Sequence, residues 1–353
     1  MGMPKVSITF TEIASTVVKR GEKGVIAMIL RDSNVPATNP ITCLSNEDVP
    51  ATLTAANQEQ IKLALMGYVN MPKKVIAYVI DSDDTYDEAL KYLKTVTFDY
   101  LVCPTVSTDN KTADIVAYVK AERAADKLIK AVLPNTVADC EGIINYATET
   151  VYVNDTEYTT EQYCSRIAGI IAGTPLSISC TYAPLTELTD CTRLTKSEMD
   201  AAVDAGKMIV WWDGEKVKTA RGVNSLTTLT DAKNAQFQKI KIIDAIDMIS
   251  SDIRMTAEDN YLGKFTNTYD NKCLLIAAIG NYFEQLVADS VLQNYSIGID
   301  VDANRAYLES KGTSTEEMTD AEIKEANTGS YVYLVATLKI LDAIEDITLS
   351  ISI

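Results

Sequence analysis

The sequence predicts an α/β domain followed by an α+β domain, with a β-strand at each end of the chain. From residue 19 to residue 184, apolar runs of strand length alternate with amphipathic helical segments, a pattern typical of a parallel sheet with crossover helices. From residue 185 to residue 340, a hairpin and long helices replace that alternation. The end segments, residues 1–18 and 341–353, contain stretches in which apolar and polar residues strictly alternate, which indicates half-buried strands.

The elements of the α/β domain are expected in the order strand, helix, strand. Thr54 is a plausible N-cap and Gly67 a plausible stop for its first helix, and Thr159 and Gln162 form a capping box for its last. The expected elements are a strand at 25–30, a helix at 54–67, a strand at 73–80, a helix at 85–95, a strand at 98–104, a helix at 111–126, a strand at 127–134 and a helix at 159–173.

The second domain has a different pattern. A capping box of Thr195 and Glu198 opens a short helix, and Asp213-Gly214 is a strong signal for a hairpin turn. Further elements are expected as helices at 231–255 and 271–289, a strand at 295–301, a short helix after Thr319 and a strand at 331–340. The first long helix carries an apolar stripe that should face the core, made of Ile242, Ile246, Ile249 and Ile253.

Composition excludes several function classes. The chain has no histidine, so Ser-His-Asp triads, Cys-His pairs and imidazole zinc sites are ruled out. A net charge of -17 argues against nucleic acid or an anionic membrane as partner, because both require a basic surface. No membrane-length apolar run or signal peptide is visible, so folding in the cytoplasm is expected. The seven cysteines form no C-x-x-C pair, which favours buried, reduced thiols.

One acidic loop is a candidate for chemistry. Asp81, Asp83 and Asp84 follow an expected parallel strand, at the edge where open α/β sheets bind ligands, and their carboxylates could hold Mg²⁺. The simpler interpretation is a solvated loop before the next helix. Neither G-x-G-x-x-G nor G-x-x-x-x-G-K-[ST] occurs, so we assign no catalytic residue, cofactor-binding residue or metal ligand.

The terminal strands could pair in two ways. The apolar faces are formed by Val6, Ile8 and Phe10 at one end and by Ile347, Leu349, Ile351 and Ile353 at the other. Within one subunit they could pair with each other or with the strand at 331–340, since domain termini are often close together. Alternatively they pair with another chain, because proteins usually protect exposed apolar edge strands with charge or proline, and neither interrupts these stretches.

Two stretches of the chain carry a family resemblance. They are GKMIVWWDGEKVKTARGVNSLTT with FQKIKIIDAIDMISSDIR, and the terminal YLVATLKILDAIEDITLSISI. Residues 206–254 and 331–353 resemble the tail sheath proteins of contractile phage tails and R-type bacteriocins, in particular the short sheath of Gram-positive, clostridial-type particles. The Gly222-Val223-Asn224 turn and the terminal strand are the more specific features, and the α/β region matches in pattern only.

This resemblance implies a structural role without catalysis. The α/β region would be a subtilisin-like, Rossmann-like outer domain, and residues 185–340 an inner sheath core domain. Strand arms at 1–18 and 341–353 would be exchanged between subunits through the apolar positions named above. The subunit would polymerise helically around a tail tube and contract to drive the tube through a target cell envelope.

The resemblance also implies partners and moving parts. The partners would be further copies of the chain, the tail tube protein, the baseplate and tail-terminator or collar proteins, with no cofactor, nucleic acid or membrane insertion. The particle, a phage tail or a bacteriocin, would assemble in the bacterial cytoplasm and leave by lysis. Segments 17–24 and 338–346 would be hinges. Lys233, Lys239 and Lys241, on a helix at 232–254, would be candidates for tube contacts, although a solvated helix face is the simpler alternative for each.

Two other function classes remain open from the residues alone. A static shell or scaffold protein would have the same edge strands but only one lattice. A metal-dependent α/β enzyme would use the loop at residues 81–84.

Overall fold

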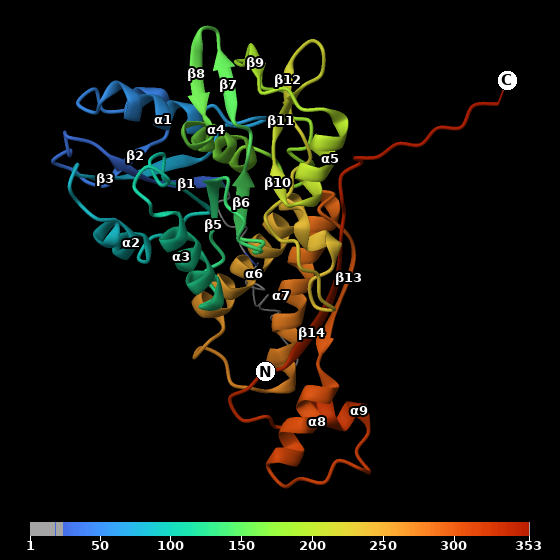
Figure 1. Cartoon of the computed structure of the whole chain (residues 1–353). Coiled ribbons are helices and arrows are strands. Elements are labelled where there is room, and N and C mark those ends of the chain that lie inside the picture. The colour runs from blue at the N-terminus through green and yellow to red at the C-terminus, as the bar shows by residue number, and fades with distance from the viewer. Residues whose placement is uncertain (1–17, 19–23, 353) are drawn as a thin grey trace, which may run out of the picture. The chain divides into compact units, whose positions relative to one another are not determined.

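The computed structural model describes Val18 and residues 24–352, which divide into two compact units (Figure 1). The α/β unit contains residues 24–251 and 342–352, and the hairpin unit contains residues 252–341 with Val18. The expected domain boundary after residue 184 falls inside the α/β unit, because β10 (Lys207–Met208) joins the same sheet as the earlier strands through parallel pairing with β6 (Ile143–Tyr146).

A seven-stranded sheet organises the α/β unit, in the order β10-β6-β5-β4-β1-β3-β2. Its other strands are β1 (Val25–Arg31), β2 (Ile41–Cys43), β3 (Lys74–Ile80), β4 (Tyr100–Val102) and β5 (Lys130–Pro134). All neighbouring pairs are parallel except β2 with β3. The predicted parallel strands are therefore present, and the antiparallel edge strand β2 was not predicted.

Helices cover both faces of this sheet (Figure 1). On one face lie α1 (Ala55–Leu65) and α4 (Thr160–Ala172), and on the other lie α2 (Asp87–Leu93) and α3 (Thr112–Ala124). β1 is buried from both sides, because alternate residues contribute to the two cores. The helices α1 and α4 pack closely at Gly169, where an added Cβ would lie 2.3 Å from the Ala64 carbonyl oxygen.

Shorter elements complete the α/β unit. The 3-10 turn η1 (Asn46–Asp48) follows β2, and a three-stranded sheet contains β7 (Thr150–Val153), β8 (Thr156–Thr159) and β9 (Asp190–Cys191). α5 (Lys196–Asp204) begins with the predicted capping box. The predicted hairpin is confirmed as β11 (Val210–Trp212) paired antiparallel with β12 (Val217–Thr219).

The long helix α6 (Ile240–Asn260) starts later than predicted. Residues 232–239 are not α-helical; they contain the 3-10 turn η2 (Ala235–Gln238), and Lys239 has the extended backbone angles φ -90° and ψ 125°. The Asn234 side chain accepts a hydrogen bond from the Gln236 N–H, which caps the start of the 3-10 turn. The extended backbone of Lys239 separates this turn from α6.

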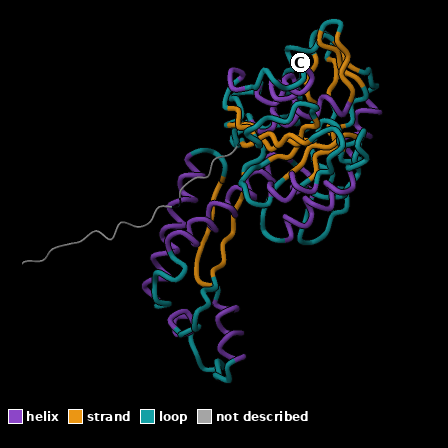
Figure 2. The backbone as a smooth tube through the Cα atoms, turned by 90° about the vertical axis from the view of Figure 1, so that its left-hand side faces the viewer, coloured by secondary structure: helices purple, strands orange, loops and turns teal. Residues whose placement is uncertain are grey.

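The hairpin unit is built on two long strands and a helix. β13 (Leu292–Ile299) pairs antiparallel with β14 (Leu334–Ile340), and α7 (Tyr269–Ala288) packs against β13 (Figure 2). Two small helices, α8 (Val301–Ser310) and α9 (Asp320–Glu325), lie in the connection between the strands. α9 and its Thr319 capping box agree with the prediction, whereas α8 was not predicted.

A buried ion cluster holds the start of α6 against the sheet of the α/β unit. The Lys130 ammonium on β5 lies 3.2 Å from a carboxylate oxygen of Asp244 and 2.9 Å from one of Asp247, and all three side chains are at most 6% exposed. Arg123 on α3 donates two further hydrogen bonds to Asp247. Burial alone would lower the pKa of Lys130, but the carboxylates of Asp247 and Asp244 outweigh it and raise this pKa.

We expect Lys130→Met to destabilise the α/β unit by about 3–5 kcal/mol, because it removes the ammonium group that lies between the buried carboxylates of Asp244 and Asp247 and leaves Arg123 to offset their charge. Urea unfolding would measure the change. Lys91→Met is the matched control: its ion pair with Glu88 is about three-quarters exposed and should contribute under about 1 kcal/mol. Equal unfolding midpoints for the two variants would show that the cluster does not fix α6.

Candidate functional site: the C-terminal arm and its anchor

The C-terminal arm, residues 347–352, extends away from the α/β unit without helix or strand structure (Figure 1). Its apolar side chains are exposed: Ile347 by 84%, Leu349 by 77% and Ile351 by 76%. Pairing of this predicted strand inside the subunit is not seen among the described residues. The other predicted exchange positions, Val6, Ile8, Phe10 and Ile353, lie outside the described residues.

The arm is preceded by an anchor, which we define as Asp342, Glu345 and Asp346 with their partners. The carboxylate of Glu345 is only 6% exposed although it adjoins an exposed arm. It accepts hydrogen bonds from the hydroxyls of Thr181 at 2.6 Å and Ser179 at 3.4 Å. A buried carboxylate is stable only when donors and positive charges surround it, so this residue holds the base of the arm.

Two cations complete the anchor. Lys239 donates to Asp342 and, at 3.1 Å, to Glu345. Arg221 donates to Asp346 at 2.7 Å and lies 3.8 Å from Glu345. Burial would lower the pKa of Lys239, but its hydrogen bonds to Asp342 and Glu345 outweigh this and raise the pKa. The hydrogen bond to Asp346 raises the pKa of Arg221. Both side chains therefore stay charged at neutral pH.

The fold brings these groups together from distant parts of the chain. Arg221 follows β12, and Thr181 lies in the loop that β12 contacts, where its hydroxyl accepts a hydrogen bond from the Gly222 N–H. Lys239 lies directly before α6, which the Lys130 cluster holds in place. The sequence does not reveal this site, because each residue alone has the character of an ordinary surface charge. The only available signal was the acidic segment DAIED beside an apolar strand.

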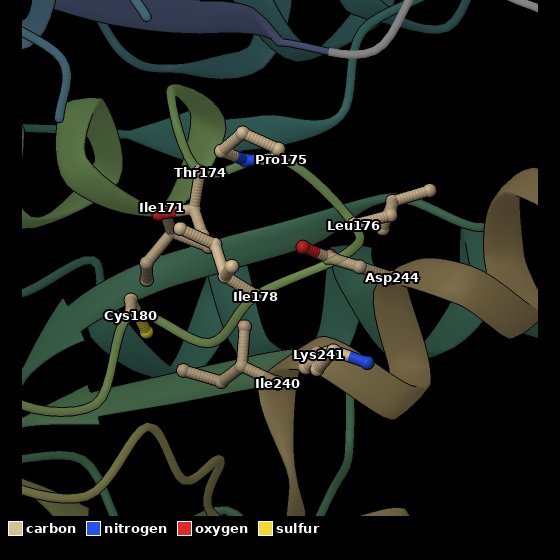
Figure 3. Close-up of a pocket in the computed structure, with 9 residues that line it drawn as sticks. All are labelled: Ile171, Thr174, Pro175, Leu176, Ile178, Cys180, Ile240, Lys241 and Asp244. Carbon is tan, nitrogen blue, oxygen red and sulfur yellow. The ribbon is translucent and has the colours of Figure 1, made fainter. Parts of the chain in front are cut away.

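The three lysines proposed for tube contact have different environments. Lys241 is 5% exposed at the start of α6, beside a small cavity lined by Ile171, Ile178 and Ile240 (Figure 3). Lys239 belongs to the anchor. Lys233 donates to both carboxylate oxygens of Glu141 at 2.9 Å and remains partly exposed. The prediction of a helix from residue 232 is wrong, because α6 begins at Ile240 and the stretch before it contains a 3-10 turn. Contact of these lysines with a tube stays a prediction.

The β13–β14 hairpin of the hairpin unit has open edges. Among the described residues, each of these strands pairs only with the other. Val335 of β14 is 50% exposed. Unpaired N–H and C=O groups along such edges can accept a further strand.

The backbone of the acidic loop at residues 81–84 accepts hydrogen bonds from a side chain of the protein itself. Arg31, at the end of β1, donates from Nη1 to the carbonyl oxygens of Asp81, Ser82 and Asp84. Its Nε lies 3.1 Å from the Asp109 carboxylate. Within the described residues, no group of three or more His, Cys, Asp or Glu side chains is arranged to hold a metal ion.

The cysteines and the long helices were also considered as candidates for chemistry or for membrane insertion. Six of the seven cysteines are buried free thiols, as predicted, and Cys273 is exposed. No helix in the part of the chain that the structure describes is long and apolar enough to cross a membrane.

Comparison with known proteins identifies the family. Residues 81–225 match the phage tail sheath protein central domain, and residues 232–353 match the phage tail sheath C-terminal domain. The tail sheath protein of Clostridium phage phiCD119 is 39% identical over 357 residues, covering 99% of each chain. The phage-like element PBSX protein XkdK of Bacillus subtilis is 30% identical over 179 residues, covering 49% of this chain and 38% of that protein.

Solved structures share the fold. The sheath tail protein of Desulfitobacterium hafniense aligns with a TM-score of 0.72 at 20% identity, covering 84% of this chain and 94% of that one. The anti-feeding prophage helical sheath in its contracted state aligns with a TM-score of 0.71 at 13% identity, covering 100% of this chain and 99% of that one. From the full-length relative and the two domain matches together, the chain belongs to the phage tail sheath protein family.

Proposed function

We propose that the protein is the structural subunit of a contractile sheath, which polymerises helically around a tail tube and contracts to drive the tube through a cell envelope. The observation that carries this proposal is an exposed apolar arm fixed at its base. Burying an Ile or Leu side chain contributes about 1.5–3 kcal/mol. In an isolated chain Ile347, Leu349 and Ile351 are exposed, so they do not contribute this free energy. Pairing with another copy would bury them, and the arm is therefore suited to that role.

The arm has the features of a strand that completes a neighbour's sheet. In residues 347–353 apolar and polar side chains alternate, which would set the register on a sheet with one buried face. The open edges of β13 and β14 are suitable acceptors in a second copy. In this proposal the N-terminal residues Val6, Ile8 and Phe10 form a corresponding strand. A head-to-tail contact of this kind produces a helical filament when its rotation does not close.

The anchor suggests where the arm bends. Residues 338–346 were expected to be a flexible hinge, yet residues up to Ile340 belong to β14, and Asp342, Glu345 and Asp346 are held by charge. The pivot of the arm would therefore follow Asp346. During contraction the arms would act as tethers while the compact units change neighbours.

The remaining assignments follow from family membership. The α/β unit would face outward, and the tail tube, baseplate and tail-terminator or collar proteins would be partners. The particle would assemble in the cytoplasm and be released by lysis. We assign no catalytic activity to the loop at residues 81–84, where Arg31 donates hydrogen bonds to the carbonyl oxygens of Asp81, Ser82 and Asp84.

The full chain is expected to form hollow helical tubes, whereas a variant that ends at Asp346 should form none, because it lacks every apolar position of the arm. Negative-stain electron microscopy of the two purified proteins makes the comparison. Discrete small particles from both proteins would reject polymerisation through the arm.

A matched pair of substitutions tests whether one face of the arm is buried. Leu349→Asp places a charge on the apolar face and should abolish tubes, while Ser350→Asp places the same charge on the opposite face and should preserve them. Sedimentation of polymer measures the yield. Similar yields from both variants would contradict a one-sided strand.

The anchor should protect the peptide bond after Glu345 from a glutamate-specific protease. Losing a charged hydrogen bond costs about 1.5–3 kcal/mol, and each 1.4 kcal/mol changes an equilibrium about tenfold. We therefore expect the double variant Arg221→Gln, Lys239→Gln to be cleaved there at least about tenfold faster. Arg193→Gln, which removes an exposed pair with Asp190, is the control. Cleavage at the same rate in all three proteins would mean that the anchor does not hold the arm.

A further inference from the structure

A groove lies beside the base of the C-terminal arm, within the α/β unit. It has a volume of about 720 Å³, and its lining includes Tyr182, Met199, Val203, Trp211, Arg221 and Asp346. One wall is formed by α5, another by β11, and a third by the anchor. The groove therefore borders the segment from which the arm leaves the subunit.

The helix α5 lacks the packing that a helix of this kind normally has. Its capping box is complete, yet it has no buried residue. Met199 and Val203, four residues apart and so on one face of the helix, line the groove and are only partly buried. Helices in proteins are stabilised mainly by packing of an apolar face. In the isolated chain the apolar face of α5 is only partly buried, so a further contact could cover it.

Tyr182 contributes an unusual backbone and an exposed ring. Its φ angle of 57° lies in the left-handed region, which is unfavourable for a bulky residue. The side chain is 56% exposed, and its ring centroid lies 5.7 Å from that of Trp211. An exposed tyrosine ring that packs on a partly buried tryptophan, on a strained backbone, is more easily explained as a contact surface than as core packing.

Trp211 adds an unused hydrogen-bond donor. Its indole Nε1 is buried but has no acceptor among the described residues. Buried donors are almost always paired in folded proteins. Because the isolated chain already shields this nitrogen from solvent, Trp211 contributes to the groove through its ring, which lies beside that of Tyr182.

We propose that the groove receives a second copy of this chain, namely the subunit that accepts the first one's arm. This inference rests on the proposed arm exchange. Residues 347–353 can span at most about 25 Å when fully extended, so the accepting copy must lie within that distance of Asp346, which is itself part of the groove wall. The copy would place an apolar side chain against Tyr182 and Met199.

Site-specific photo-cross-linking tests this contact. The photoreactive amino acid p-benzoylphenylalanine replaces Tyr182 in the full chain, tubes are formed and irradiated, and the joined peptides are identified by mass spectrometry. The expected product is a covalent dimer whose second peptide comes from another copy. The same substitution in the chain ending at Asp346 is the control, and should give no dimer.

The possible outcomes separate the two proposals. Tubes that form normally but give no dimer, or that give only links within one chain, would overturn the groove contact and leave arm exchange intact. A full chain that forms no tubes would overturn arm exchange, and with it the groove contact. A product joined to a different protein, if irradiation is repeated in a lysate, would also overturn the proposal.

A pair of substitutions provides an independent readout. Tyr182→Gly removes the ring and relieves the left-handed backbone, so the thermal midpoint of the chain ending at Asp346 should be unchanged or higher while polymer yield of the full chain falls. Tyr182→Phe keeps the ring and should preserve yield. A lower midpoint with undiminished polymer yield would show that Tyr182 serves the fold of the subunit and not its contact with another copy.

Discussion

The buried ion cluster around Lys130 is the constraint on which much of the α/β unit depends. It joins β5 and α3 to the first turns of α6 through groups that cannot be separated without leaving a buried charge unbalanced. Because Lys239 lies directly before α6, the same cluster positions one of the two cations of the anchor. Charges in the interior of the α/β unit thus fix the position of Lys239 at its surface, and through the anchor they fix the base of the arm.

In the α/β unit, the edge of the sheet at which open α/β sheets bind ligands is held by hydrogen bonds within the chain. At the carboxyl ends of its strands, Arg31 takes the place that a cation would occupy among the carbonyl oxygens of residues 81–84. Tyr86 and Thr105 also donate to Asp109, the carboxylate that pairs with Arg31. Side chains of the chain itself therefore use the hydrogen-bonding groups at this edge of the sheet.

Much of this fold could be predicted from the sequence, because buried parallel strands and capped helices leave periodic patterns. Several elements escaped prediction: β2 has three residues, α8 follows closely after β13, and the stretch before Ile240 forms a 3-10 turn in place of the expected helix. Alternation identified the apolar positions of the arm, but it predicted a half-buried strand, whereas residues 347–352 are extended and exposed without a strand partner among the described residues. The anchor was not, since Arg221, Lys239 and Glu345 meet only after folding and nothing local marks them as partners.

The location of the arm and of the open hairpin in different units has a consequence for assembly. Under arm exchange each copy would donate from the α/β unit and accept on the hairpin unit, so a row of copies would be polar. One end would present unfilled strand edges, and the other would present unpaired arms. Growth and termination would then require chemically different partners at the two ends, and a single capping protein could not serve both.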